Sequence, residues 1–332
     1  MYEREREFAL SALRTAAVIC RAVQAQIDPG RLDKADKSPV TVADLAVQAA
    51  VSRLLAEQFP ADPLVAEETA DELRTPAWAA IRGRVVERVA AALGQRADEG
   101  TVLGWIDRGQ HSGGAAGRFW TLDPVDGTKG FLRRGQYAVA LALIVDGRPQ
   151  LGGLACPNLP ERIDPAAETP PNGAGALFIA TRGRGAEMHG LAGAGPVSPL
   201  RVSPADPDQA RCCESVEAAH SSHDDAARVT QAVGLTRPGL RLDSQAKYAV
   251  VARGEAALYF RLSPNREYRE KIWDHAAGAL VVEEAGGRVT DVEGRPLDFS
   301  QGRLLTRNTG IVASNGGLHE RVLAAIREVL PR

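Results

Sequence analysis

The stretch LDPVDGTKGFL, residues 122–132, combines two kinds of residue that seldom serve one purpose. Asp123 and Asp126 lie three positions apart around a proline, and Gly127, Thr128 and Lys129 follow at once. Carboxylates repel phosphate, whereas glycine-rich turns with a lysine attract it. A strand that ends at Asp123 and a helix that begins near Gly127 would bring both carboxylates into one small volume. Two like charges that close need a compensating positive charge.

A divalent cation supplies that charge. Mg²⁺ takes oxygen ligands and keeps coordination positions for water and phosphate. The backbone carbonyl of Val125, between the two acids, offers a third oxygen. The N–H groups of Gly127, Thr128 and Lys129 open the next helix and face an anion. The segment therefore predicts acids that hold a metal, and a metal and a helix start that hold a phosphate. An Asp-rich turn that only caps a helix is the simpler alternative.

Three other carboxylate segments favour the metal site. Asp44 is expected in the first turn of a helix, with Thr41 as N-cap, and the AEET segment places Glu67 and Glu68 directly after a short strand. Asp274 stands at the start of an apolar helix, where a half-buried charge needs a partner. Taken singly, these acids also fit helix-dipole complementation, a solvated loop and an N-cap.

Composition limits the fold and the partners. The 332 residues are 44% hydrophobic and 25% charged, which suits two globular domains. The formal net charge of −2 argues against nucleic-acid polymers and anionic membranes as partners. Four cysteines without a C-x-x-C pair argue against zinc and predict reduced thiols in a cytoplasmic protein. No apolar run is long enough to span a membrane.

Hydrophobic periodicity predicts the order of elements. Helices are expected over 3–26, 42–59, 76–97, 271–287 and 318–330; strands over 64–66, 119–123 and 309–317; and hairpins over 137–156, 177–190 and 288–297. The glycine-rich stretch 106–118 is a candidate lid. The pattern predicts an α+β domain over 1–190 with most metal ligands. It also predicts an α/β domain over 191–332, which contains Asp274.

Four segments, SPVTVAD, VAEET, WTLDPVDGTKGF and KIWDHAAGALVVEEAGG, resemble in order and spacing the lithium-sensitive, magnesium-dependent phosphatases related to inositol monophosphatase. Within that group, DGTKGFLRRGQYAVALALI, ESVEAAHSSHD and DSQAKYAVVARG resemble the 3'(2'),5'-bisphosphate nucleotidases. The resemblance covers nearly the whole chain. It implies a two-domain layered αβαβα sandwich, in which the domain over 191–332 carries the nucleotide-binding residues and the last metal-binding Asp. It also implies two or three Mg²⁺ ions per active site, inhibition by Li⁺, and a monomer or homodimer.

The resemblance also implies roles for single residues. Those that correspond to metal ligands are Glu67, Asp123, Val125 through its carbonyl, Asp126 and Asp274. Asp44 and Thr128 correspond to the pair that activates the attacking water. Those that correspond to substrate-binding residues are Gly127, Thr128, His220, Ser244, Lys247, Arg261 and Asp274. Ala66 stands where the family commonly has glycine, which matters only if its φ is positive.

The implied reaction removes the 3'-phosphate of 3'-phosphoadenosine 5'-phosphate, giving AMP and phosphate, and 3'-phosphoadenylyl sulfate is a further expected substrate. Two alternatives stay open. One is an inositol phosphate or sugar phosphatase on the same scaffold. The other is a non-catalytic nucleotide sensor, which is disfavoured because a sensor has no need for the water-activating Asp44 and Thr128.

Overall fold

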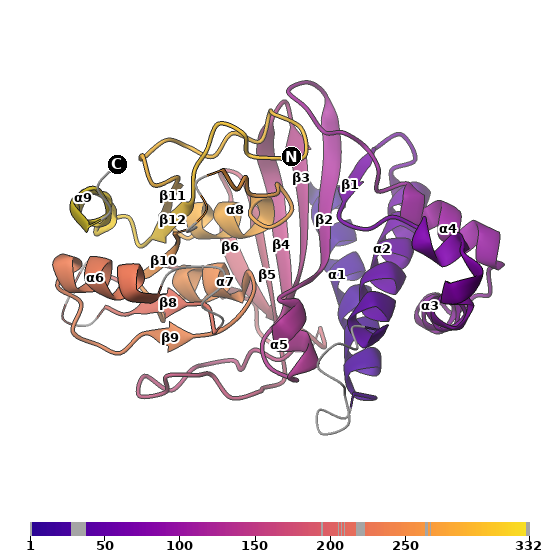
Figure 1. Ribbon diagram of the computed structural model, residues 1–332, viewed down its shortest axis with the longest axis horizontal. Coiled ribbons are helices and arrows are strands. Elements are labelled where there is room, and N and C mark those ends of the chain that lie inside the picture. The colour runs from indigo at the N-terminus through magenta and orange to yellow at the C-terminus, as the bar shows by residue number, and fades with distance from the viewer. Residues whose placement is uncertain are drawn as a thin grey trace.

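Alternating layers of helices and sheets make up the described part of the chain (Figure 1). The computed structural model describes residues 2–27, 38–193, 195–204, 206, 208, 210–216, 223–262, 265 and 267–329, with backbone alone at 38–40 and 223. The helices are α1 (Glu3–Gln24), α2 (Ser38–Gln58), α3 (Ala79–Leu93), α4 (Glu99–Asp107), α5 (Thr128–Leu132), α6 (His223–Val233), α7 (Ala246–Ala252), α8 (Ala276–Glu284) and α9 (His319–Val329). Short 3₁₀ turns occupy Glu72–Arg74 and Pro76–Trp78.

Two sheets form the strand layers. The first has the order β1-β2-β3-β4-β5-β6-β7 and comprises β1 (Leu64–Ala66), β2 (Arg118–Asp126), β3 (Ala138–Val145), β4 (Arg148–Cys156), β5 (Ala176–Thr181), β6 (Gly185–Gly190) and β7 (Ser198–Pro199). In this first sheet β1 runs parallel to β2, and the other pairs of neighbouring strands are antiparallel. The second has the order β11-β12-β10-β8-β9 and comprises β8 (Cys212–Glu214), β9 (Leu240–Arg241), β10 (Leu258–Arg261), β11 (Arg288–Thr290) and β12 (Ile311–Ser314).

The layers follow from which faces are apolar. β3 reads AVALALIV without alternation, as expected of a strand covered on both faces. Helices α1 and α2 cover one face of the first sheet, and α7 and α8 fill the space between the two sheets, while α6 and α9 lie outside the second (Figure 1). Three buried apolar clusters occupy the spaces between these layers. The predicted αβαβα order is confirmed, with α3 and α4 packed outside α2.

Several sequence-based boundaries need correction. α2 begins at Ser38, so Thr41 lies inside the helix rather than at its N-cap, and Asp44 lies in the second turn. The predicted hairpin over 288–297 is wrong, because β11 pairs with β12 and the following turn is held by the Asp291 carboxylate, which accepts the N–H of Arg295 at 2.9 Å. The last helix of the central layer begins at Ala276, after Asp274 rather than before it.

Helix α4 was missed because glycines interrupt its periodicity, although Asp98 caps it by accepting the N–H of Thr101 at 2.9 Å. The candidate lid over 106–118 therefore begins inside this helix. Its next residues run along β1, where the Gly109 carbonyl accepts the N–H of Ala66 at 2.8 Å. Such main-chain pairing anchors the start of that stretch to the sheet.

The division at 190/191 stays a prediction. The first sheet continues to β7 at Ser198–Pro199, and the second begins with β8 at Cys212. None of the described helices is both long enough and apolar enough to cross a bilayer.

A glycine allows the middle helices to pack closely. A Cβ at Gly278 of α8 would lie 2.3 Å from the Tyr248 ring on α7. We expect Gly278→Ala to lower the free energy of unfolding by about 1–3 kcal/mol, because backbone must move to admit the methyl group. Urea unfolding measures this change.

The matched control is Gly83→Ala in α3, where nothing lies within 4 Å of the added Cβ. Alanine is favoured over glycine in a helix by about 1 kcal/mol, so this variant should be as stable as the parent or more so. If Gly278→Ala lowers the free energy of unfolding no more than Gly83→Ala does, the close packing is contradicted.

Candidate active site

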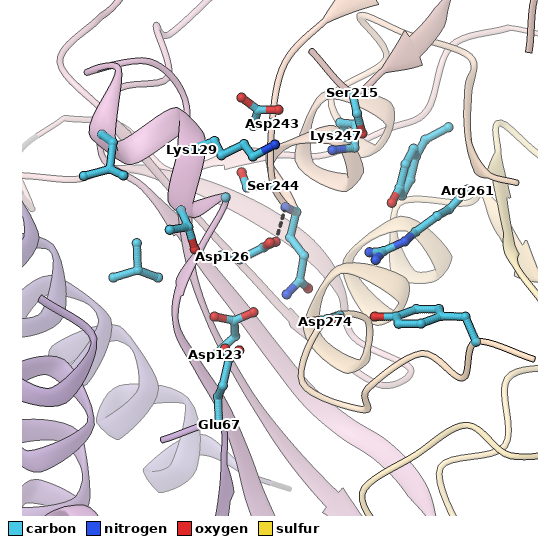
Figure 2. A pocket seen from close by; sticks show the side chains of 17 residues that line it. Glu67, Asp123, Asp126, Lys129, Ser215, Asp243, Ser244, Lys247, Arg261 and Asp274 are labelled. Carbon is cyan, nitrogen blue, oxygen red and sulfur yellow. Dashed lines mark hydrogen bonds between the residues drawn. The ribbon is translucent and has the colours of Figure 1, made fainter. Parts of the chain in front are cut away.

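A cavity of about 470 Å³ lies between the first sheet and the second half of the chain. Its volume lies within the range of ordinary small-molecule sites. The residues predicted for the site that line it are Glu67, Asp123, Val125, Asp126, Gly127, Thr128, Ser244, Lys247, Arg261 and Asp274. Figure 2 shows Glu67, Asp123 and Asp126 on one side, with Lys247 and Arg261 on the other. Two predicted residues are not among them: Asp44 is buried behind this lining, and His220 falls outside the described residues.

An irregularity in β2 brings Asp123 and Asp126 to the same cavity. In a regular strand, side chains three positions apart point to opposite faces. The pairing of β2 with β3 shifts register between Asp123 and Asp126, where Pro124 has no N–H to donate. The strand therefore runs on to Asp126, past the end predicted at Asp123, and α5 begins at Thr128. Because α5 is a single short turn, the segment offers an anion its N–H groups rather than a long helix dipole.

Gly127 and Ser244 meet at the floor of the cavity. Gly127 has φ 87°, and a Cβ there would lie 2.9 Å from the Ser244 Cβ. Ser244 is itself left-handed at φ 71°, and its Oγ accepts the N–H of Ala246 at 3.1 Å. The close approach brings the next N–H, that of Gln245, onto Oδ2 of Asp126. Asp126 is thus oriented by the second half of the chain.

The acids of the cavity destabilise one another's charged forms. Burial, and then the field of Asp274, raise the pKa of Glu67 to about 8, and burial raises the pKa of Asp274 to about 6. The pKa of Asp123 is raised well above its usual range by burial and by Glu67 and Asp126. Its Oδ1 is buried and has no hydrogen-bond partner among the described residues. An orphaned carboxylate oxygen among other carboxylates suits a hard cation such as Mg²⁺.

Asp44 belongs to the same electrostatic group. Its pKa is raised well above its usual range, first by burial and then by Glu68 and Glu67. Its own charge in turn raises the pKa of Asp123. Ala66, which precedes this acidic pair, lies in β1 and does not have a positive φ, so alanine is accommodated there without strain.

Positive groups occupy the opposite wall. Lys247 is fully buried, with its Nζ 5.2 Å from the centroid of the Tyr259 ring. Burial lowers its pKa, while the carboxylates of Asp126 and Asp243 act in the other direction. Arg261, at the end of β10, places its Nε 3.1 Å from Oε1 of Glu270. The cavity therefore joins an acidic wall to a basic wall.

Three positioning residues were missed by the sequence analysis. Gln48 donates from Nε2 to the carbonyl of Glu68 at 2.7 Å, and its Oε1 accepts the N–H of the same residue at 3.0 Å. Gln245 donates to the Trp273 carbonyl at 2.9 Å, directly before Asp274. Arg303 donates to the Ala66 carbonyl. The available signal was weak: Gln48 is a polar residue, four positions after Asp44, inside the apolar run of α2.

Another acidic group was also missed. Ligand atoms of Glu270, Asp274 and His275 lie within 4.8 Å of one another. Glu270 forms an ion pair with Arg261 through Oε1, which lies 3.1 Å from Nε, and its Oε2 lies 3.1 Å from His275 Nε2. Of these three residues, only Asp274 lines the cavity.

The raised pKa values make a pH-dependent cation effect testable. The pKa of Glu67 is about 8 in the folded protein and 4.5 ordinarily. As pH rises, the Glu67 carboxyl therefore loses its proton in the unfolded chain before it does so in the folded one. Between those two pKa values, rising pH therefore lowers the free energy of unfolding of the metal-free protein. A cation bound to the ionised carboxylate offsets this loss of stability. We expect Mg²⁺ to raise Tm more at about pH 8 than at about pH 5.

Differential scanning calorimetry measures both shifts, with NaCl at matched ionic strength as the control for screening. If Mg²⁺ raises Tm equally at the two pH values, the result would count against cation binding among these acids.

Comparisons with known proteins agree with this geometry. The model of the inositol monophosphatase family matches residues 2–330. A 3'(2'),5'-bisphosphate nucleotidase of Emericella nidulans is 42% identical, with 99% of each chain covered. One of Oryza sativa is 45% identical, covering 99% of this chain and 95% of that protein.

Solved structures share the fold at lower identity. Mycobacterium tuberculosis SuhB matches with a TM-score of 0.60 and 22% identity, covering 98% of this chain and 97% of that one. CysQ from Bacteroides thetaiotaomicron matches with a TM-score of 0.62 and 19% identity, covering 95% and 98%. By family match, relatives and fold together, the chain belongs to the inositol monophosphatase family.

Proposed function

We propose that this protein is a magnesium-dependent 3'(2'),5'-bisphosphate nucleotidase that converts 3'-phosphoadenosine 5'-phosphate into AMP and phosphate. The observation that carries the proposal is one cavity that has acids on one wall and the cations Lys247 and Arg261 on the other. A substrate with two anionic groups meets both walls at once. The relatives named above bear the same activity in their names.

The acidic wall is where the reacting phosphate would bind. Glu67, Asp123, the Val125 carbonyl, Asp126 and Asp274 are the oxygens that would hold two or three Mg²⁺ ions. When bound, such ions would polarise the phosphate oxygens and lower the pKa of a water. Burial and then the neighbouring carboxylates raise the pKa values of Glu67 and Asp123, and bound cations would offset that repulsion.

Asp44 and Thr128 would handle the proton of the attacking water. Asp44 is buried with a raised pKa, so it can accept a proton near neutral pH more readily than a surface carboxylate can. Thr128 is the first residue of α5 and lines the cavity, where its hydroxyl can orient a water. Gly127, whose left-handed φ no other residue adopts easily, presents Thr128 at this position.

The basic wall would bind the rest of the nucleotide. Ser244, Lys247 and Arg261 come from the second half of the chain and line the end of the cavity away from Glu67 and Asp123 (Figure 2). A buried lysine and a half-buried arginine suit a second phosphate, or the phosphosulfate of 3'-phosphoadenylyl sulfate, better than they suit an uncharged ring. This wall favours a nucleotide with two anionic groups over a simple inositol phosphate.

We further propose a cytoplasmic protein that acts as a monomer or homodimer on small molecules. All four cysteines are free, buried thiols, which suits a reducing compartment.

A substrate panel tests the assignment. Phosphate release from 3'-phosphoadenosine 5'-phosphate is expected to exceed release from inositol 1-phosphate by at least about 100-fold in kcat/KM, since inositol 1-phosphate has one anionic group and cannot meet both walls. Fructose 1,6-bisphosphate has two phosphates, so faster release from it than from the nucleotide would support the sugar phosphatase instead. Activity should require Mg²⁺ and fall with added Li⁺. Turnover of inositol 1-phosphate alone would move the protein to a different activity within the family, and absence of all turnover would favour a nucleotide sensor.

Asp126→Asn tests the acidic wall. The substitution removes one charge while keeping the size of the side chain and its contact with the Gln245 N–H. We expect kcat/KM to fall about 100-fold or more, since one metal loses a charged ligand.

Asp146→Asn is the matched control. Asp146 occupies the β3–β4 turn at φ 48°, a conformation that asparagine also tolerates, and lies outside the cavity. Wild-type rates in Asp126→Asn at ordinary magnesium, with circular dichroism showing both variants folded, would rule out the two-metal arrangement.

A further inference from the structure

The Arg261 side chain is held on two sides where it enters the cavity. Its Nε lies 3.1 Å from Oε1 of Glu270, and its guanidinium carbon lies 5.7 Å from the centroid of the Tyr268 ring. The side chains of Arg261 and Glu270 are largely buried. Tyr268 is 38% exposed and lines the same cavity. An arginine clamped by an ion pair at one edge and an aromatic ring on one face has few conformations left to lose on binding.

Glu270 is in turn fixed from behind. Its Oε2 lies 3.1 Å from His275 Nε2, and Nδ1 of that histidine lies 2.8 Å from the Tyr248 hydroxyl. Glu270, His275 and Tyr248 are all buried. The chain of contacts ties the end of β10 to α7 and to the start of α8, so Glu270 cannot move without disturbing two helices.

The geometry also selects which edge of the guanidinium meets a ligand. Glu270 takes the Nε side, and the terminal nitrogens are the donors that suit a phosphate. Arg261 lies on the basic side of the cavity, opposite Glu67 and Asp123 (Figure 2). Its place on the side of the cavity opposite Glu67 and Asp123 assigns it to the substrate's second anionic group rather than to the reacting one.

We propose that Glu270 and Tyr268 are positioning residues that hold Arg261 ready for the non-reacting 5'-phosphate of the nucleotide; this rests on the proposed function. Ordering a flexible arginine only when the ligand arrives would weaken binding. Glu270 and Tyr268 remove that penalty without touching the reacting phosphate. Their loss should therefore raise KM for nucleotides and leave the chemical step largely intact.

The experiment compares Glu270→Gln, Tyr268→Leu, Arg261→Gln and the double variant Arg261→Gln/Glu270→Gln. AMP binding is measured by calorimetry, and kcat and KM are measured with 3'-phosphoadenosine 5'-phosphate and with phenyl phosphate, which lacks a second anionic group. We expect each single variant to weaken AMP binding and raise the nucleotide KM about tenfold. For Glu270→Gln and Tyr268→Leu, kcat/KM for phenyl phosphate should stay within about twofold of wild type.

The double variant distinguishes positioning from general support of the fold. If Glu270 acts through Arg261, the double variant binds AMP no worse than Arg261→Gln alone. Additive losses, or equal losses of kcat on both substrates in Glu270→Gln, would overturn the inference. Tyr268→Leu keeps the test open if Glu270→Gln does not fold, because Tyr268 lies partly at the surface.

Asp291→Asn is the control for breaking a buried carboxylate–arginine pair elsewhere. Asp291 is fully buried and lies 2.7 Å from Arg295 Nη2, outside the cavity. This variant should lose stability and keep the wild-type KM. Tight AMP binding that the variants weaken, without phosphate release by the wild type, would refute the proposed function and support the positioning role. AMP binding unchanged in the variants, or absent in the wild type, would refute the positioning role.

Discussion

Repulsion among buried carboxylates is the constraint on which the site depends. Glu67, Asp123, Asp126 and Asp274 share one cavity, and burial raises the pKa of each. Four acids held together in a low-dielectric space cost the fold stability unless protons or cations neutralise them. Such an arrangement suits a bound cation, which would in turn suit an anionic substrate.

The layered fold supplies the rigidity that this arrangement requires. Glu67 follows β1 and the two central aspartates end β2, so the parallel pairing of these strands brings the three acids to one sheet edge. The Gln48 side chain, on α2, bonds the backbone of Glu68. Gln245 donates its backbone N–H to the Asp126 carboxylate and its side-chain amide to the carbonyl of Trp273, directly before Asp274. Neutral amides suit this purpose, because they bind backbone groups without adding to the charge of the site.

The two halves of the chain contribute opposite charges to one cavity. The first half supplies most of the acids, while Lys247 and Arg261 come from the second. Arg303 joins the halves, since it donates to the Ala66 carbonyl and lies 4.8 Å over the ring of Trp273, next to Asp274. A shift of one half against the other would separate the acidic wall from the basic one, so recognition and chemistry both depend on this interface.

The sequence by itself determined the elements with strong periodicity and the identity of the acids, because apolar spacing and the DPVDGT segment are local signals. It could not place the end of β2, since a register shift depends on the partner strand. Nor could it find Gln48 or Gln245, whose partners are distant in sequence. Only tertiary structure decided which buried polar groups meet, because hydrogen bonds and ion pairs of this kind form between segments that periodicity treats separately.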